Sequence, residues 1–103
     1  MADPMKIRVT LQGDVADVRV LMAHPMETGL RKDTAGKTIP AHHITQVKAS
    51  VGDRTVLEAR WSQAVSQNPF LQFRFGGAKA GDVVTVTWVD NQGDKRTDAA
   101  AIV

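Results

Sequence analysis

A histidine, a methionine and a glutamate lie close together in the segment HPMETGLRKD, which covers residues 24–33. These residue types support three kinds of chemistry. Imidazole and thioether groups bind metal ions, imidazole and carboxylate groups exchange protons, and a proline-stiffened loop with apolar and charged side chains contacts other proteins. The rest of the sequence has to distinguish a metal site, an acid–base site and a contact surface.

A metal site in this segment would use His24 and Met26, with Met22 just before them. Imidazole nitrogen and thioether sulfur suit copper, so a periplasmic copper-binding β-sandwich is one interpretation of the sequence. His42 and His43 offer two more imidazoles, but neighbours in an extended chain point to opposite faces and are not expected to share one ion. Because methionines also fill gaps in cores, we assign no metal ligand from the sequence.

An acid–base site would use Glu27 and His24, with Asp33 orienting the imidazole. No serine or glycine-rich nucleophile turn accompanies these residues in the sequence, and no second carboxylate is placed to act as the partner acid or base. Gly76 and Gly77 precede no predicted helix, so they do not form a phosphate-binding loop. We therefore predict no catalytic residue and no cofactor, and a protein that is not an enzyme.

The elements that must position this segment are short strands. Apolar and polar residues alternate with a period of two, which puts one side of each strand on a core. The alternation predicts strands at residues 7–11, 18–22, 46–51, 54–61, 71–75, 84–88 and 95–103. Turn residues separate them: Gly52-Asp53 joins one predicted hairpin and the stretch 76–82 a second. The one helix candidate is a turn at residues 61–66.

This pattern predicts an all-β fold, an immunoglobulin-like β-sandwich of about seven antiparallel strands. The segment from His24 to Pro40 interrupts it, since it is much longer than the usual connection of about 4–6 residues. Long ordered loops in compact domains are more often functional than not, which favours a contact surface.

Composition narrows the class of protein. A chain of 103 residues is expected to form a single domain, residues 1–103. The net charge of +2 is spread along the chain and the aromatic share is only 5%, which argues against a nucleic-acid-binding protein. No apolar run has the length of a membrane span, and MADPMKIRVTL lacks the apolar core of an export signal, which alone would predict a cytoplasmic protein. The absence of cysteine excludes thiolate chemistry.

Several motifs together resemble one family. They are His24-Pro25-Met26-Glu27-Thr28-Gly29, Arg31-Lys32-Asp33, Gly36, Ile39-Pro40, Asn68-Pro69-Phe70, Gly81-Asp82, Trp88, Asp90-Asn91-Gln92-Gly93 and Asp98. In this order and spacing they resemble the SoxZ family, the small subunit of the SoxYZ carrier of bacterial sulfur oxidation. The loop from His24 to Pro40 is the most specific part of the resemblance, whereas the strands match only as a pattern.

The resemblance implies a non-catalytic subunit that forms a heterodimer with SoxY. In that family SoxY bears the cysteine on which sulfur intermediates are carried, and other Sox enzymes dock transiently. The resemblance also implies a periplasmic location, reached together with a SoxY that carries the export signal.

Two surfaces are therefore expected to bind partners. The first is the loop, facing SoxY or the visiting enzymes through His24, Pro25, Met26, Glu27, Thr28, Gly29 and Arg31. The second is a sandwich face with apolar strand positions that are expected to be exposed, such as Leu21, Val56 and Val89, since an obligate partner would cover them.

Overall fold

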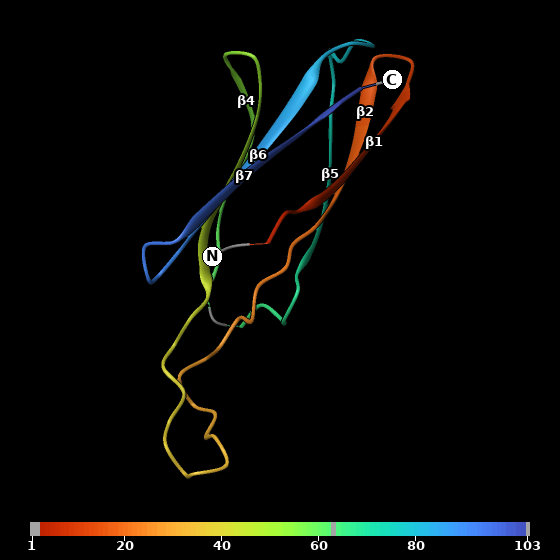
Figure 1. Cartoon of the computed structure of the whole chain (residues 1–103). Helices are drawn as coiled ribbons and strands as arrows, with labels where there is room; N and C mark the ends of the chain where they lie inside the picture. The colour runs from red at the N-terminus through yellow and green to blue at the C-terminus, as the bar shows by residue number, and fades with distance from the viewer. Residues whose placement is uncertain (1–2, 63, 103) are drawn as a thin grey trace.

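The computed structural model describes residues 3–62 and 64–102, and within them the chain forms two packed antiparallel sheets (Figure 1). The strands are β1 (Lys6–Gln12), β2 (Val15–Leu21), β3 (Ile44–Val51), β4 (Arg54–Arg60), β5 (Phe70–Phe75), β6 (Val83–Asp90) and β7 (Lys95–Ala101). One sheet has the order β1-β2-β5 and the other the order β4-β3-β6-β7. The predicted all-β, immunoglobulin-like β-sandwich is confirmed.

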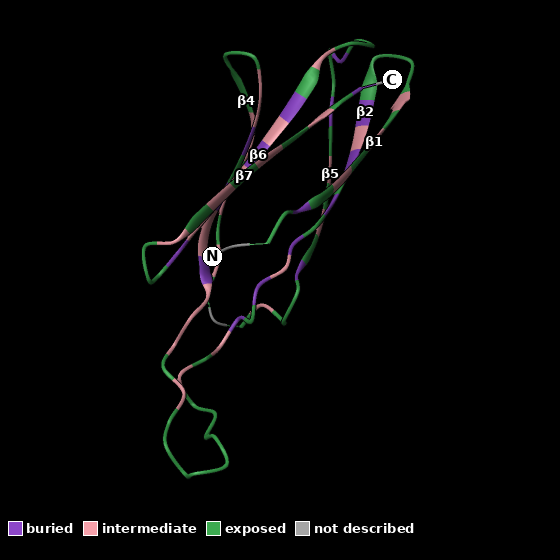
Figure 2. Ribbon diagram, viewed as in Figure 1, coloured by how far each residue is buried: buried purple, intermediate pink, exposed green. Residues whose placement is uncertain are grey.

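The core lies between the two sheets and follows the alternation of the sequence. Val18 and Val20 on β2 are fully buried, as are Val84 and Val86 on β6, and Trp88 is 1% exposed. Their neighbours along each strand face outward, which gives the banded burial pattern of the ribbon (Figure 2). Branched apolar side chains on one face of each strand therefore account for the packing of the sheets.

The connection from β5 to β6 differs from the expected hairpin. β5 pairs with β2, with Ala16 opposite Phe75, whereas β6 pairs with β3 in the other sheet. The glycine-rich turn between them crosses from one sheet to the other, and Ala78 on this turn donates its N–H to the Asp14 carbonyl at 2.8 Å. Turn residues show where a chain reverses, but not which neighbour a strand will pair with.

The helix candidate at residues 61–66 is also wrong as far as the structure describes it. Residue 63 lies outside the described residues, and the remainder forms an irregular turn in which Val65 donates its N–H to the Ser62 carbonyl. In the described part of the chain, no helix is long and apolar enough to cross a membrane.

The connection between β2 and β3 extends beyond the end of the sandwich as a long, narrow arm (Figure 1). Two isolated antiparallel bridges hold its two sides together, Glu27 with His42 and Lys32 with Thr38. We call residues 24–43 the arm. With it the molecule measures 53 × 21 × 21 Å, so the arm turns a compact sandwich into an elongated shape.

Candidate functional site

Three ionisable side chains converge where the arm leaves the sandwich. His24 follows β2, His42 precedes β3, and Asp90 ends β6. Asp90 Oδ2 lies 3.0 Å from His24 Nε2 and 2.8 Å from His42 Nε2. His24 is 4% exposed and Asp90 is 4% exposed, while the His42 side chain is 30% exposed. We call these three residues the His–His–Asp cluster.

The backbone around the cluster completes the bonding of Asp90. Its Oδ1 accepts the N–H groups of Gln92 and Asp94 at 3.0 and 2.9 Å. Burial alone would raise the pKa of Asp90, but the hydrogen bonds from His24, His42 and these backbone groups together hold that pKa below its ordinary value. Asp90 is therefore an ionised carboxylate at neutral pH, with both oxygens fully used.

The protonation of His24 follows from its two neighbours. Its Nδ1 accepts the backbone N–H of Met26 at 3.1 Å, so Nδ1 carries no proton and Nε2 donates to Asp90. Burial lowers the pKa of His24, and the hydrogen bond to Asp90, which acts in the opposite direction, does not cancel this effect. The cluster thus contains a neutral imidazole in one defined tautomer.

The three ligand atoms of the cluster lie within 4.8 Å of one another, which is the spacing a metal site needs. The hydrogen bonding disfavours such a site. A metal ion at His24 Nε2 would displace its proton while Nδ1 still faces the Met26 N–H, which would require a fully deprotonated ring. Metal-bound histidines instead donate their second nitrogen to an acceptor. The Met26 sulfur faces the Ile44 N–H at 3.4 Å, so the copper interpretation gains no support.

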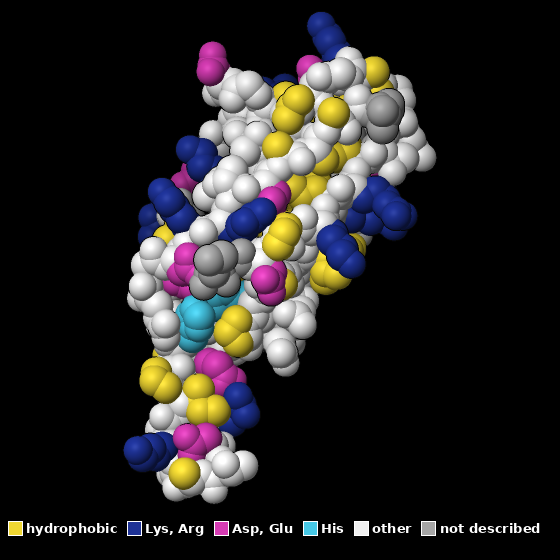
Figure 3. All heavy atoms as spheres, viewed as in Figure 1, with side chains coloured by type: hydrophobic (Ala, Val, Ile, Leu, Met, Phe, Trp, Pro, Cys, Tyr) yellow, Lys and Arg dark blue, Asp and Glu magenta, His cyan; other side chains and the backbone are white. Residues whose placement is uncertain are grey.

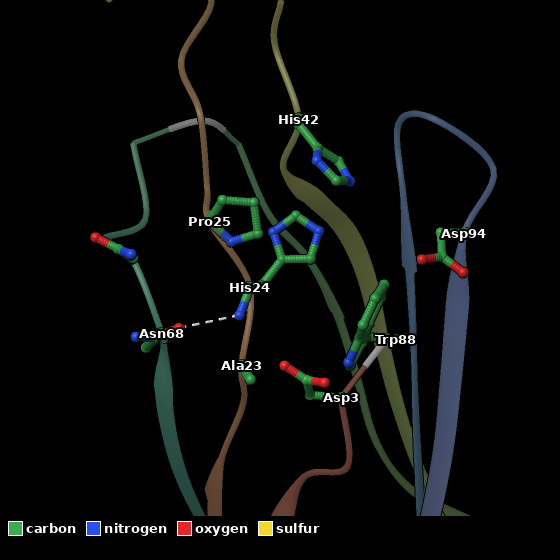
Figure 4. A pocket seen from close by; sticks show the side chains of 9 residues that line it. Asp3, Ala23, His24, Pro25, His42, Asn68, Trp88 and Asp94 are labelled. Atoms are coloured by element: carbon green, nitrogen blue, oxygen red, sulfur yellow. Dashed lines mark hydrogen bonds between the residues drawn. The ribbon is translucent and has the colours of Figure 1, made fainter. Parts of the chain in front are cut away.

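Beside the cluster is a hollow of about 270 Å³ (Figure 4). His24, His42, Asn68 and Trp88 line it, together with the carboxylates of Asp3 and Asp94. The Trp88 ring packs edge-to-face against His24, with ring centroids 5.0 Å apart. The buried indole Nε1 has no hydrogen-bond acceptor among the described residues.

Three separate sequence motifs meet at the base of the arm. Asn68 donates its N–H to the His24 carbonyl at 2.9 Å, and its side-chain oxygen accepts the His24 N–H at 3.1 Å. Asn91, in the β6–β7 turn, holds the returning side of the arm: its amide nitrogen donates to the Ala41 carbonyl and its oxygen accepts the His43 N–H, both at 2.8 Å. The base of the arm is therefore fixed from both sides.

The predicted contact segment begins with residues that shape the arm. Met26 is 5% exposed and has a positive φ of 49°, a conformation that side chains rarely adopt. Gly29, with φ at 86°, approaches Ala41 so closely that an added Cβ would lie 3.2 Å from the Ala41 Cβ. His24 and Met26 are buried at the base of the arm, which leaves little of either side chain for a partner to touch. Their contact with a partner stays a prediction.

Most of the remaining residues of the segment are exposed, whereas Gly29 and Glu27 are of intermediate exposure. Pro25, Thr28 and Arg31 are exposed, and the Arg31 Nε donates to both carboxylate oxygens of Glu27, at 2.9 and 3.1 Å. This pairing raises the pKa of Arg31, since the carboxylate of Glu27 favours the charged guanidinium. Leu30 is 83% exposed. The arm therefore presents a charged pair, a proline and an apolar side chain on its surface.

The expected apolar pairing positions lie on two different sheets. Leu21 on β2 is 42% exposed, as expected. Val56 and Val89, on the other sheet, are only half-buried, which corrects the expectation that they are exposed, and Val56 packs against the core because the register shifts near it, between Ala49 and Ser50. A single flat partner surface cannot cover Leu21 together with Val89.

Sequence reasoning named Asp90 only as part of a family motif and His42 only as an imidazole set aside as a metal ligand, and it missed that both meet His24. A signal was present, because Asp90 continues the alternation of Val84, Val86 and Trp88 and so lies on the buried face of β6. A buried carboxylate requires hydrogen-bond donors, and histidines supply them.

The comparisons with known proteins agree with this picture. A family model described as "Sulphur oxidation protein SoxZ" matches residues 5–101, nearly the whole chain. None of the curated proteins matches the chain significantly.

Proposed function

The chain belongs to the SoxZ family of sulfur oxidation proteins, and we propose that it is the non-catalytic subunit of a two-subunit sulfur carrier. Its partner is SoxY, which bears the cysteine that carries sulfur intermediates while Sox enzymes act on them. The pair works in the periplasm, and the exported SoxY brings this chain along.

The observation that supports the proposal, beside the family, is that the sequence of this chain contains no thiol to carry sulfur. The sequence has no cysteine. Its buried acid–base groups are bonded to each other and to the backbone, since Asp90 accepts four hydrogen bonds and His24 uses both ring nitrogens. A subunit without a thiol does not compete with its partner for the sulfur.

The arm supports a role in recognition. Its two sides are joined by the two bridges, and its base is held by the hydrogen bond from Asn91. The arm projects from the sandwich and is mostly exposed (Figure 2), and Leu30 and Arg31 are among its exposed residues. Most of its tip lies at the surface, where a partner can reach it. A loop that is held by its own hydrogen bonds loses less entropy on binding than a loop without them.

The test is to purify this chain by affinity from its own source grown on thiosulfate and to weigh the assembly by native and denaturing mass spectrometry. We expect a one-to-one complex with a subunit that carries a terminal cysteine and sulfur-containing mass additions on it. A chain that is recovered alone, or with bound copper, would contradict the proposal.

A further inference from the structure

The outer face of the β1-β2-β5 sheet combines cationic and apolar side chains in strand register. Lys6 lies opposite Leu21, and Leu21 lies opposite Phe70 on the next strand. Leu21 is 42% exposed and Phe70 is 60% exposed, so the two side chains form a small apolar patch at one end of this face. The next outward row begins with Arg8 opposite Arg19.

This face holds more positive than negative charge, with Lys6, Arg8, Arg19 and Arg74 against Asp17. Like charges directly opposite each other on antiparallel strands repel, and Arg8 and Arg19 are such a pair. Asp17 is the only acidic residue in the three strands. It lies 3.6 Å from Arg19 and 3.9 Å from Arg74, while Arg8 forms no ion pair with any described residue. An external carboxylate would relieve the repulsion.

The same side chains line a hollow of about 370 Å³. It is lined by Lys6, Ile7, Arg8, Arg19, Leu21 and Phe70. A second hollow of about 230 Å³ adjoins it, because Lys6 and Leu21 line both. Lys and Arg side chains also gather at the edge of the molecule beside the three-stranded sheet (Figure 3). We call the two hollows together the basic groove.

We propose that the basic groove docks an acidic, extended segment of a partner protein. The acidic side chains lie over Arg8 and Arg19, and an apolar side chain of the segment packs on Leu21 and Phe70. An extended segment fits because every second residue of a strand faces the same side. The distance between two such residues is about the distance between the pair Arg8–Arg19 and the pair Leu21–Phe70, which lie two residues apart along β2. Exposed apolar area rimmed by charge is the usual composition of a contact site.

The charges around the groove favour a protein segment over a membrane or a nucleic acid. The second hollow leads on to the hollow beside the His–His–Asp cluster, since Ala23 and Asn68 line both. The carboxylates of Asp3 and Asp94 line that third hollow. A uniformly anionic surface would be repelled there, whereas a peptide can confine its carboxylates to the part over Arg8 and Arg19.

The inference goes beyond the proposed pairing and does not depend on it. The groove lies on the sheet opposite to Val56 and Val89, and it can be probed on the isolated full-length chain. A transient partner would use this face while the other sheet holds the permanent subunit.

The test measures binding of fluorescein-labelled Glu-Ser-Glu-Ser-Leu by fluorescence polarisation, with Lys-Ser-Lys-Ser-Leu as the opposite-charge probe. The first, third and fifth residues of such an extended peptide face the same side, so its charged and apolar side chains reach the groove together. We expect the acidic probe to bind and the basic probe not to bind, with affinity falling as salt rises. Arg8→Glu should weaken binding at least tenfold without unfolding the chain, because it places a carboxylate opposite Arg19. Leu21→Ser with Phe70→Ser should weaken it at least tenfold too.

Matched controls are Arg60→Glu and Lys95→Glu, exposed cations of the other sheet, which should leave binding unchanged. The inference is overturned if neither probe binds, if both bind equally, or if the control variants weaken binding as much as Arg8→Glu does. Binding of phosphatidylserine vesicles that Arg8→Glu abolishes would assign the face to a membrane, and self-association that Leu21→Ser abolishes would assign it to a second copy. Either result would also overturn it.

Discussion

At the scale of single residues, the segment that looked most reactive turned out to build structure. His24 bonds Met26 through one ring nitrogen and Asp90 through the other. Its spacing to Met26, which suggested a metal site, instead holds the left-handed turn that starts the arm. Residue types and spacing identified an important segment, but only the fold shows which side chains face each other.

The His–His–Asp cluster predicts a loss of stability in mild acid. Because the folded-state pKa of His24 lies below its ordinary value of 6.5, the unfolded chain takes up a proton first as pH falls through that value. Lowering the pH from 7.5 to 5.5 should therefore reduce the free energy of unfolding, by on the order of 1 kcal/mol from this residue. The pKa of Asp90, held below 3.8, adds a further loss only in stronger acid, as pH falls through its folded-state value.

Urea unfolding at the two pH values measures this effect. In His24→Gln the loss between pH 7.5 and 5.5 should be smaller, although the variant is less stable overall because a hydrogen bond to a buried carboxylate is lost. Gln12→Ala, at an exposed position of β1 outside the cluster, should keep the wild-type pH dependence. An unchanged loss in His24→Gln would show that His24 does not couple folding to protons.

At the scale of elements, the strands were predictable and their partners were not. Period-two alternation placed all seven strands, because each buries one face. It could not tell that β5 joins β2 instead of β6, since pairing across sheets depends on long-range packing. The arm was predicted only as a long connection. Its antiparallel bridges and its clamp by Asn91 needed the structure.

The surface of the arm predicts charge-dependent recognition. Glu27→Arg combined with Arg31→Glu keeps an ion pair across the same positions but reverses its direction. If the arm contacts SoxY or a visiting enzyme, this swap should lower heterodimer affinity or thiosulfate turnover by roughly tenfold, because charges at an interface are matched to one partner. Titration calorimetry and thiosulfate-dependent activity of the reconstituted system measure the two quantities.

A control for the arm is Asp53→Lys, a charge reversal at an exposed residue of the β3–β4 turn, which lies at the end of the sandwich away from the arm (Figure 1). The control should alter heterodimer affinity less than the arm swap does. Normal affinity together with normal turnover after the Glu27 and Arg31 swap would remove the arm from the recognition surfaces.

At the scale of the whole molecule, the sandwich offers two outer faces of different character. One carries the basic groove, and the other carries Val89 beside small hydroxyl side chains such as Thr87 and Thr97, which bond each other at 2.9 Å. The second face also carries charge, since Lys48 lies opposite Glu58 and Lys95 lies opposite Val89. Its half-buried Val89 is the apolar position that the pairing prediction places under the permanent partner.

Val89→Lys should therefore dissociate the heterodimer, and Val56→Lys should do the same or weaken it, as size-exclusion chromatography with light scattering would show. Because Val56 packs on the core, circular dichroism must confirm that this variant folds. Leu21→Lys, on the opposite sheet, should leave the pair intact. A stable heterodimer of Val89→Lys would refute the assignment of this face.

The position of the arm's tip predicts that the two fragments of a chain cleaved there stay associated. Residues 33–37 are exposed, and the chain on the N-terminal side of them contains only β1 and β2. β2 pairs along its length with β5, which lies in the other fragment. Cleavage after Lys32 or Lys37 by brief trypsin treatment should therefore leave two peptides that stay together as one folded particle in native mass spectrometry. Residues 33–37 are therefore suitable for new chain termini, either as the break point of a split reporter or as the ends of a circular permutant.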